Sequence, residues 1–209
     1  MKPERKFVME ILNQYSLKVV EPGEEDIAMS FINEAKAFLK SRGVDQWQKG
    51  YPDANTIKRD IANQRGYFLM ADECPLAYMC IDFEGEPAYD GLNGRWLNNS
   101  SSYGVLHRLA IGAKYRGRGL ATISFKLAEA LMERRKAGSF RIDTDENNAV
   151  MKHLLSKNGF TCCGTIWFDN SYCPKTDSPV VGRFGSTTAL KSHTKSYCKK
   201  PSGAHGKNG

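Results

Sequence analysis

Residues 106–121 read Leu106-His107-Arg108-Leu109-Ala110-Ile111-Gly112-Ala113-Lys114-Tyr115-Arg116-Gly117-Arg118-Gly119-Leu120-Ala121. The apolar run Tyr103–Ile111 predicts a strand that is buried on both faces. A basic, glycine-rich turn follows and opens into an amphipathic helix predicted over residues 119–137. Glycines let several backbone N–H groups face one point, and a helix N-terminus adds partial positive charge. The stretch therefore predicts a binding loop for an anion such as a pyrophosphate.

The loop differs from the two common nucleotide-binding loops. It has no Gly-Lys-Ser/Thr of a P-loop, and no GxGxxG with an acidic residue about 20 positions later. On arginine and glycine content alone, a basic surface turn between a strand and a helix is the competing interpretation. The elements around the loop decide between the two.

The flanking segments predict one domain with a mixed sheet. Before residue 103 we expect a strand, two helices and a β-hairpin, at Leu17–Val20, Asp26–Leu39, from Asp53 onward, and at Tyr67–Ala71 with Leu76–Phe83. After the long helix we expect a strand, a helix and a strand, at Phe140–Asp143, Asn148–Lys157 and Phe160–Phe168. This order of elements predicts an α/β (α+β) fold with a central sheet flanked by helices.

With these motifs in place, the sequence resembles the GNAT superfamily of N-acetyltransferases. The loop fits the family pattern (Gln/Arg)-x-x-Gly-x-(Gly/Ala) at Arg116, Gly119 and Ala121. Downstream, Asp145–Asn148 and Lys157-Asn158-Gly159-Phe160 resemble the family's N…K-x-G-F segment, at a matching distance from the loop. The resemblance covers residues 17 to about 168.

The resemblance implies a sheet that splays between the strands at about 103–111 and 140–144, with acetyl-CoA as acyl donor in the opening. Strand backbone would pair with the pantetheine arm, and loop N–H groups would hold the pyrophosphate. Asn148 would position the pantetheine or the departing thiol, although capping the following helix is an equal alternative. The residues implied in acetyl-CoA binding are Leu109, Ala110, Ile111, Arg116, Gly117, Arg118, Gly119, Leu120, Ala121, Thr122 and Asn148.

The catalytic residues depart from the family pattern. The usual glutamate of the strand is replaced by Val105, and the usual tyrosine acid by Leu155. His107 is the remaining candidate for the general base, because Leu106–Ile111 resembles the Leu-His-x-Leu-Ala-Val strand of arylalkylamine acetyltransferases and a histidine pKa near 6.5 suits proton removal. A core histidine with a structural hydrogen bond is the alternative.

The acceptor pocket is less defined by the sequence. A long loop is predicted over residues 84–102. An acidic stretch leads into this loop and consists of Asp82, Glu84, Glu86 and Asp90. These residues would attract a cationic acceptor, share the role of general base, or form a solvated loop edge. Four aromatic residues would wall the pocket or pack under loops, namely Trp47, Tyr51, Tyr89 and Trp96.

Composition excludes several other classes of function. Hydrophobic residues make up 41% and no stretch approaches the roughly 20 apolar residues of a membrane span. No signal sequence precedes the domain, which predicts a cytoplasmic protein without membrane association. Cysteine and histidine spacing predicts no metal site, and Cys162-Cys163 is expected to be a pair of buried thiols. The net charge of +7 lies mostly beyond residue 170, so nucleic-acid binding is disfavoured.

Three segments are expected. Residues 1–16 form an N-terminal helical extension, 17–170 the acyltransferase domain, and 171–209 a basic C-terminal segment. Of the 39 residues from 171 on, 10 are hydrophobic, which predicts disorder beyond about residue 190. Val180–Phe184 is the candidate for a final strand that is short or misplaced.

The resulting hypothesis is an N-acetyltransferase that moves an acetyl group from acetyl-CoA to a primary amine by direct attack. Its acceptor is a small-molecule or peptide amine, and a homodimer is one candidate assembly. A non-catalytic acyl-CoA-binding module is the alternative, because both usual catalytic residues are replaced.

Overall fold

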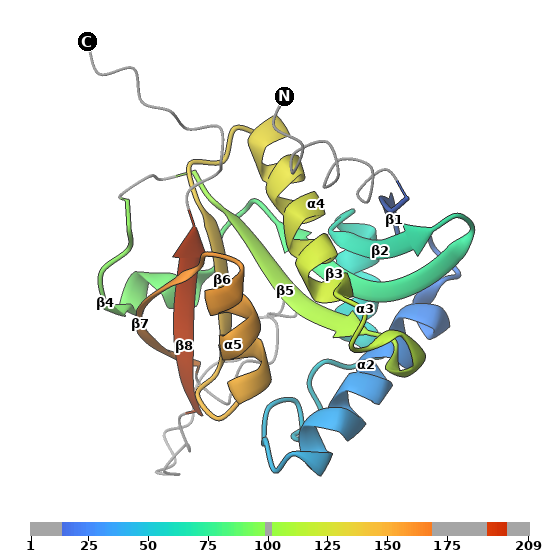
Figure 1. Cartoon of the computed structure of the whole chain (residues 1–209), viewed down its shortest axis with the longest axis horizontal. Helices are drawn as coiled ribbons and strands as arrows, with labels where there is room; N and C mark the ends of the chain where they lie inside the picture. The colour runs from blue at the N-terminus through green and yellow to red at the C-terminus, as the bar shows by residue number, and fades with distance from the viewer. Residues whose placement is uncertain (1–13, 99–101, 169–191, 200–209) are drawn as a thin grey trace, which may run out of the picture.

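Eight strands form one mixed sheet in the order β1-β2-β3-β5-β6-β8-β7-β4 (Figure 1). The computed structural model describes residues 14–98, 102–168 and 192–199. Neighbouring strands are antiparallel except for β5 and β6, which are parallel. The strands are β1 (Ser16–Val19), β2 (Gly66–Ala71), β3 (Cys74–Asp82), β4 (Asn93–Gly94), β5 (Gly104–Ile111), β6 (Phe140–Asp145), β7 (Thr161–Phe168) and β8 (Ser192–Lys199).

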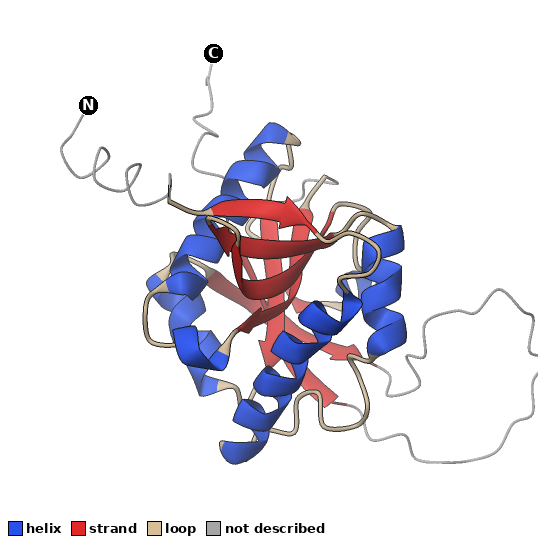
Figure 2. Ribbon diagram, turned by 90° about the vertical axis from the view of Figure 1, so that its right-hand side faces the viewer, coloured by secondary structure: helices blue, strands red, loops and turns tan. Residues whose placement is uncertain are grey.

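The described part of the chain has four α-helices, which cover the two faces of this sheet (Figure 2). Phe31 of the first helix and Ile57 of the second pack with Phe68 on one face, whereas Ile123 and Phe125 of the third pack on the other. The mixed α/β architecture predicted from the sequence is confirmed. The helices are α2 (Glu25–Ser41), α3 (Ala54–Ala62), α4 (Leu120–Arg134) and α5 (Ala149–Lys157), with short 3-10 turns η1 (Pro87–Gly91) and η2 (Ala113–Tyr115).

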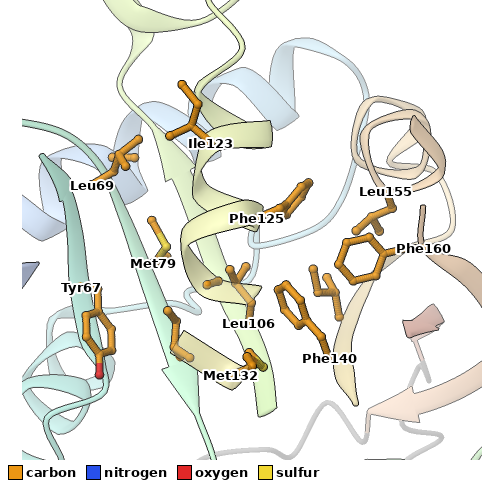
Figure 3. Packing of buried hydrophobic residues seen from close by; sticks show 14 of the residues in the cluster. Tyr67, Leu69, Met79, Leu106, Ile123, Phe125, Met132, Phe140, Leu155 and Phe160 are labelled. Atoms are coloured by element: carbon orange, nitrogen blue, oxygen red, sulfur yellow. The ribbon is translucent and has the colours of Figure 1, made fainter. Parts of the chain in front are cut away.

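The β2–β3 hairpin is buried on both faces and joins the two cores. Tyr67 and Leu69 face the α4 side, whereas Phe68 and Met70 face α2 and α3. This alternation follows from the two-residue period of a strand. Figure 3 shows the larger core, in which side chains of β2, β3 and β5 lie beside α4, and the ring of Phe160 packs against Phe125 and Phe140.

Strands β5 and β6 separate after a short parallel contact. They pair at Gly104↔Phe140 and Val105↔Arg141, near the start of both strands. Figure 1 shows the two arrows leaving the same region and diverging. The pairing of β5 with β3 continues to Ile111 on the other side. The predicted splay between these two strands is confirmed, and one edge of β5 beyond Val105 has no strand partner among the described residues.

A bulge in β5 lies just beyond the point of separation. His107 pairs with Cys80 and Ala110 with Tyr78, so β5 carries one residue more than β3 over this interval. Arg108, inside the bulge, has a φ of 55°, which is the left-handed region that non-glycine residues rarely adopt. The bulge therefore re-aims the side chains of His107 and Arg108.

Strand β8 corrects the prediction for the C-terminal segment. Disorder was expected beyond about residue 190, whereas Ser192–Lys199 pairs with β6 on one side and β7 on the other. The segment was misjudged because small hydroxyl residues, which lower its hydrophobicity, are buried there: Thr194 is 7% and Ser196 0% exposed. The candidate strand at 180–184 lies outside the described residues.

The described residues begin near the predicted end of the N-terminal extension. Most of the helical extension predicted for residues 1–16 lies outside the described residues, and Ser16 already belongs to β1.

The prediction that Cys162 and Cys163 are both buried is right for one thiol and wrong for the other. Cys163 is buried and lies 2.9 Å from the sulfur of Cys198, whereas Cys162 is exposed. Adjacent strand residues point to opposite faces, so the two thiols do not share one environment.

Tyr197 tests the contribution of β8 to the fold. Tyr197→Ala removes a ring that is 7% exposed and belongs to the larger core, so we expect a loss of about 3 kcal/mol in the free energy of unfolding. Ile27→Ala, at a side chain that is 42% exposed, is the control and should change stability by less than about 1 kcal/mol. Urea denaturation measures both. Equal effects would contradict the assignment of β8 as a core strand.

Candidate active site

A cavity of about 970 Å³ opens where β5 and β6 diverge. Its walls come from β5, the loop before α4, the α2–α3 loop, β6 and the start of α5, with Thr194 of β8. All predicted site residues except Arg118 line it: His107, Leu109, Ala110, Ile111, Arg116, Gly117, Gly119, Leu120, Ala121, Thr122 and Asn148. One cavity thus collects residues that are far apart in the sequence.

The loop before α4 has the conformation that its glycines predict. Gly117 and Gly119 both have a φ of 78°, and Gly119 is the left-handed N-cap of α4. A Cβ at either position would meet no atom within 4 Å, so the space beside the loop is open. The first N–H groups of a helix lack intrahelical acceptors. Those of α4 therefore present hydrogen-bond donors and partial positive charge next to the cavity.

The two arginines of the loop play different parts. The guanidinium of Arg116 donates to the carbonyl oxygens of Ile111 (3.3 Å) and Glu34 (3.0 Å) and lies over the ring of Phe38. It ties the loop to α2. Arg118 is exposed, and its guanidinium lies 5.9 Å from the centre of the Tyr115 ring.

Asn148 performs the capping role that the sequence left as an alternative. Its Oδ1 accepts from the backbone N–H of Met151 at 3.1 Å. Its Nδ2 donates to Oε1 of Gln46 at 2.8 Å, which joins the start of α5 to the α2–α3 loop. The hydroxyl of Thr122 accepts from the side chain of Asn158 at 3.2 Å. The polar side chains at this end of the cavity are therefore held in place by the protein.

His107 lies beside a buried carboxyl group. Its Nδ1 is 3.9 Å from Oδ1 of Asp143 on β6, and both side chains are 14% exposed. The same Oδ1 accepts from the hydroxyl of Tyr89 at 2.8 Å. The array Tyr89–Asp143–His107 spans the opening between the two diverging strands, and sequence reasoning found only its histidine.

Burial sets the protonation of this pair. Desolvation, with the nearby guanidiniums of Arg108 and Arg65, lowers the pKa of His107 to about 3, so the imidazole is neutral at pH 7. Desolvation raises the pKa of Asp143 to about 6, so this carboxyl is ionised at pH 7 and protonated in mild acid. Asp143 is therefore the stronger base of the two.

Arg108 forms the most extensive ion pair of the site. Its Nε and Nη2 donate to the two carboxyl oxygens of Asp60 at 2.9 and 2.6 Å, and its Nη1 donates to the hydroxyl of Tyr51 at 2.6 Å. The hydroxyl of Tyr78 also donates to Asp60, at 2.6 Å. Asp60 is 3% exposed and sits on α3, so this network fixes the β5 bulge to the α3 side of the cavity.

The acidic stretch divides into two parts. Asp82 and Glu86 are buried and line the cavity, and Asp82 is paired with Arg65 at 2.6 Å. Glu84 and Asp90 are exposed, as expected for a solvated loop edge. Buried and exposed acidic residues alternate along this stretch, so the composition of the stretch could not show which of them line the cavity.

The aromatic residues divide in the same way. Trp47 and Tyr51 line the cavity. Tyr89 and Trp96 instead pack against each other under the loop before β5, with ring centres 5.1 Å apart. Val105 and Leu155, at the positions of the usual glutamate and tyrosine, are fully buried core residues.

Asp60, Arg65, Asp143 and Gln46 were missed as site residues. Asp143 ended the predicted strand Phe140–Asp143, which was a usable signal. Asp60, Arg65 and Gln46 come from α3 and its flanking loops. Nothing in the sequence indicates that they line the same cavity as the residues of β5.

Comparison with known proteins agrees with this geometry. The model of the Acetyltransferase (GNAT) family matches residues 32–160. A GNAT-family acetyltransferase structure from Streptococcus agalactiae is 32% identical, covers 89% of this chain and 95% of its own, and has a TM-score of 0.72. The chain belongs to the GNAT acetyltransferase family.

More distant structures share the fold. The ribosomal-protein-S18-alanine N-acetyltransferase from Escherichia coli is 14% identical, with a TM-score of 0.57 and coverage of 93% of this chain and 97% of that one. A structure of the NatC complex bound to Gag peptide and CoA is 12% identical and has a TM-score of 0.56. The match covers 90% of this chain and 98% of that one. A search of curated protein sequences finds no match. Within the described residues, no helix is both long and apolar enough for a membrane span.

The Arg108–Asp60 pair allows a stability prediction. Asp60→Asn leaves a buried guanidinium without its countercharge, and we expect a loss of about 3 kcal/mol in the free energy of unfolding. Adding Arg108→Gln should recover part of that loss, because the double variant buries no unpaired charge. Urea denaturation of the four proteins of this cycle gives the coupling. Additive losses would show that the two side chains do not depend on each other.

Proposed function

We propose that this protein transfers an acetyl group from acetyl-CoA to the nitrogen of a primary amine by direct attack. The observation that carries the proposal is a single cavity shared by the helix N-terminus, the unpaired edge of β5 and the His107–Asp143 pair. The amine nitrogen would form a bond to the thioester carbonyl carbon while the C–S bond breaks. CoA would leave as a thiolate and take up the proton that the nitrogen loses as it becomes an amide.

The residues present fit acetyl-CoA as the donor. The open space beside Gly117 and Gly119, at the positive end of α4, would accommodate a pyrophosphate. The edge of β5 at Leu109–Ile111 would pair with the amide groups of the pantetheine arm, as an added strand does. Leu120, Ala121 and Thr122 would contribute backbone N–H groups of the first helical turn.

Proton removal would fall to His107 and Asp143 together. The neutral imidazole of His107 would accept the amine proton and pass it on from Nδ1 to the carboxylate of Asp143, which is the stronger base of the two and lies 3.9 Å away. The hydroxyl of Tyr89 would hold Asp143 in place through its 2.8 Å hydrogen bond. His107 remains the proposed general base, now with a partner on β6.

A non-catalytic acyl-CoA-binding module is the second candidate. Val105 and Leu155 favour it, because both are apolar core residues at positions where the family has polar ones. The buried Tyr89–Asp143–His107 array favours catalysis, since burying a carboxyl costs free energy that binding of CoA alone does not require. A screen of amines and peptides with acetyl-CoA, read as released thiol, separates the two. Peptides are included in the screen because the NatC complex, which is bound to a peptide, and the ribosomal-protein acetyltransferase share the fold.

Gly119→Ala tests the pyrophosphate site. An L-residue in this left-handed conformation costs about 1–2 kcal/mol, so the loop should shift and its N–H groups should move. We expect an approximately tenfold weaker acetyl-CoA affinity in calorimetry. Gly23→Ala is the matched control, because Gly23 also has a positive φ with open space around it and lies outside the cavity. Equal affinity in wild type and Gly119→Ala would contradict the assignment.

The pH dependence of turnover tests the His107–Asp143 pair. Because the pKa of Asp143 is raised to about 6, activity should fall as pH decreases through 6 and the carboxyl becomes protonated. His107→Gln should lower kcat yet keep this acid limb, since the pKa of His107 lies near 3. Asp143→Asn should lower kcat, and its residual activity should lack the limb. A limb that disappears in His107→Gln would assign it to the histidine instead.

A further inference from the structure

Two carboxyl groups at one end of the cavity, one buried and one with a side chain that is 14% exposed, have no guanidinium or ammonium partner in the described part of the chain. Glu86 is 9% exposed and caps the short turn η1, where its Oε1 accepts from the backbone of Ala88 at 3.1 Å. Asp143, on β6, accepts from Tyr89 and faces the neutral imidazole of His107. Glu86, Asp143 and His107 all line the cavity.

The cations of this end are already engaged by other carboxylates. Arg65 is bound to Asp82 at 2.6 Å, and Arg108 is bound to both oxygens of Asp60. Farther along the wall, Lys49 pairs with Asp45 at 3.1 Å, whereas Arg59 donates to the neutral hydroxyl of Thr56 at 3.3 Å and keeps its positive charge. The Arg65–Asp82 and Arg108–Asp60 ion pairs are each neutral overall. Beside them, the end of the cavity next to His107 carries two negative charges when Glu86 and Asp143 are ionised.

Burial makes these two charges unfavourable unless a cation joins them. Desolvation is the main cause that raises the pKa of each carboxyl, and the negative charge of Glu86 further raises the pKa of Asp143. Arg108 partly offsets this for both groups without contacting either at ion-pair distance. An ammonium group in the same space would be attracted by both carboxylates in a region of low dielectric.

We propose that Glu86 and Asp143 bind the ammonium group of the acceptor, and that the acceptor is an organic amine without a carboxylate on the carbon that bears the nitrogen. This inference rests on the proposed acetyl transfer, for which it names the substrate class. An α-carboxylate would lie beside two protein carboxylates, and the nearby guanidiniums are already bound to Asp60 and Asp82. Such an acceptor would be repelled rather than recognised.

The same arrangement links recognition with proton transfer. The bound ammonium would lie next to His107 and Asp143, and loss of one proton to this pair gives the neutral nitrogen that attacks the thioester. Glu86 would keep its negative charge and hold the amine during this step. Glu86 is therefore assigned to acceptor binding and Asp143 to both binding and proton removal.

The test compares amines with the amino acids that differ from them by one carboxylate. Tyramine and tyrosine, and histamine and histidine, are assayed at pH 8 with acetyl-CoA. For at least one pair, we expect kcat/KM of the amine to exceed that of the amino acid by more than tenfold. In Glu86→Gln this ratio should fall toward one, mainly through a higher KM for the amine. Asp90→Asn, an exposed acid in the same short turn, is the control and should keep the ratio.

A binding measurement covers the case in which Glu86→Gln does not fold. Tyramine carries its charge at both pH 8 and pH 5.5, so calorimetry on the wild-type protein should show weaker binding at pH 5.5, where Asp143 is protonated. Binding that is equal at both pH values would overturn the inference.

The outcomes separate this inference from the proposed function. Turnover in which amino acids equal or exceed their amines, or in which only peptides react, would overturn the acceptor class and leave acetyl transfer intact. Absence of acetyl-CoA binding would overturn the proposed function and the inference with it. Binding of acetyl-CoA without turnover of any amine or peptide would favour the binding module and also overturn the inference.

Discussion

The separation of β5 from β6 is the constraint on which the rest of the site depends. After Val105 the two parallel strands stop pairing, and β5 continues along β3 alone. The bulge at Arg108 is held by an ion pair to Asp60 on α3 and by Tyr51, so β5 is fastened to the side away from β6. A left-handed residue in a strand costs about 1–2 kcal/mol. The bidentate hydrogen bonds offset this strain and hold the bulge against α3.

The cavity that results has two ends of opposite electrostatic character. At one end, the N-terminus of α4 and its glycine loop present N–H groups and partial positive charge. At the other, carboxyl groups outnumber the guanidiniums that pair with them, and His107 is neutral because it is buried. A donor that carries phosphate and an acceptor that carries an ammonium would each be attracted to a different end. Such an arrangement brings two substrates together without placing their charged groups in the same space.

Much of the fold followed from local sequence signals. Hydrophobic periodicity and glycine stops predicted the helices α2, α4 and α5, the β2–β3 hairpin and the strand–loop–helix unit around Gly119. These features depend on neighbours in the sequence. Strand β8 was missed because a central strand is held by backbone pairing on both sides, and serine or threonine can be buried there without a hydrophobic signal.

The site was predictable to the extent that its parts lie on one segment. The loop residues and His107 were found because they follow one another along the chain. Asp143 and Asp60 became visible only when the sheet placed them beside His107 and Arg108. The roles of the two loop arginines also required tertiary structure. Arg116 and Arg118 look equivalent in the sequence, yet Arg116 binds backbone carbonyls while Arg118 faces solvent.

The position of β8 has a consequence for how the chain is assembled during synthesis. Strands β1, β2, β3 and β5 pair among themselves from residues that leave the ribosome early, with α4 following directly. Strands β6 and β7 have to wait, because the strand that joins them is translated after both. During that interval the backbone edges of β6 and β7 are available to wrong partners. Slow translation or chaperone binding over the last part of the coding sequence would therefore affect the yield of folded protein more than a delay near its beginning.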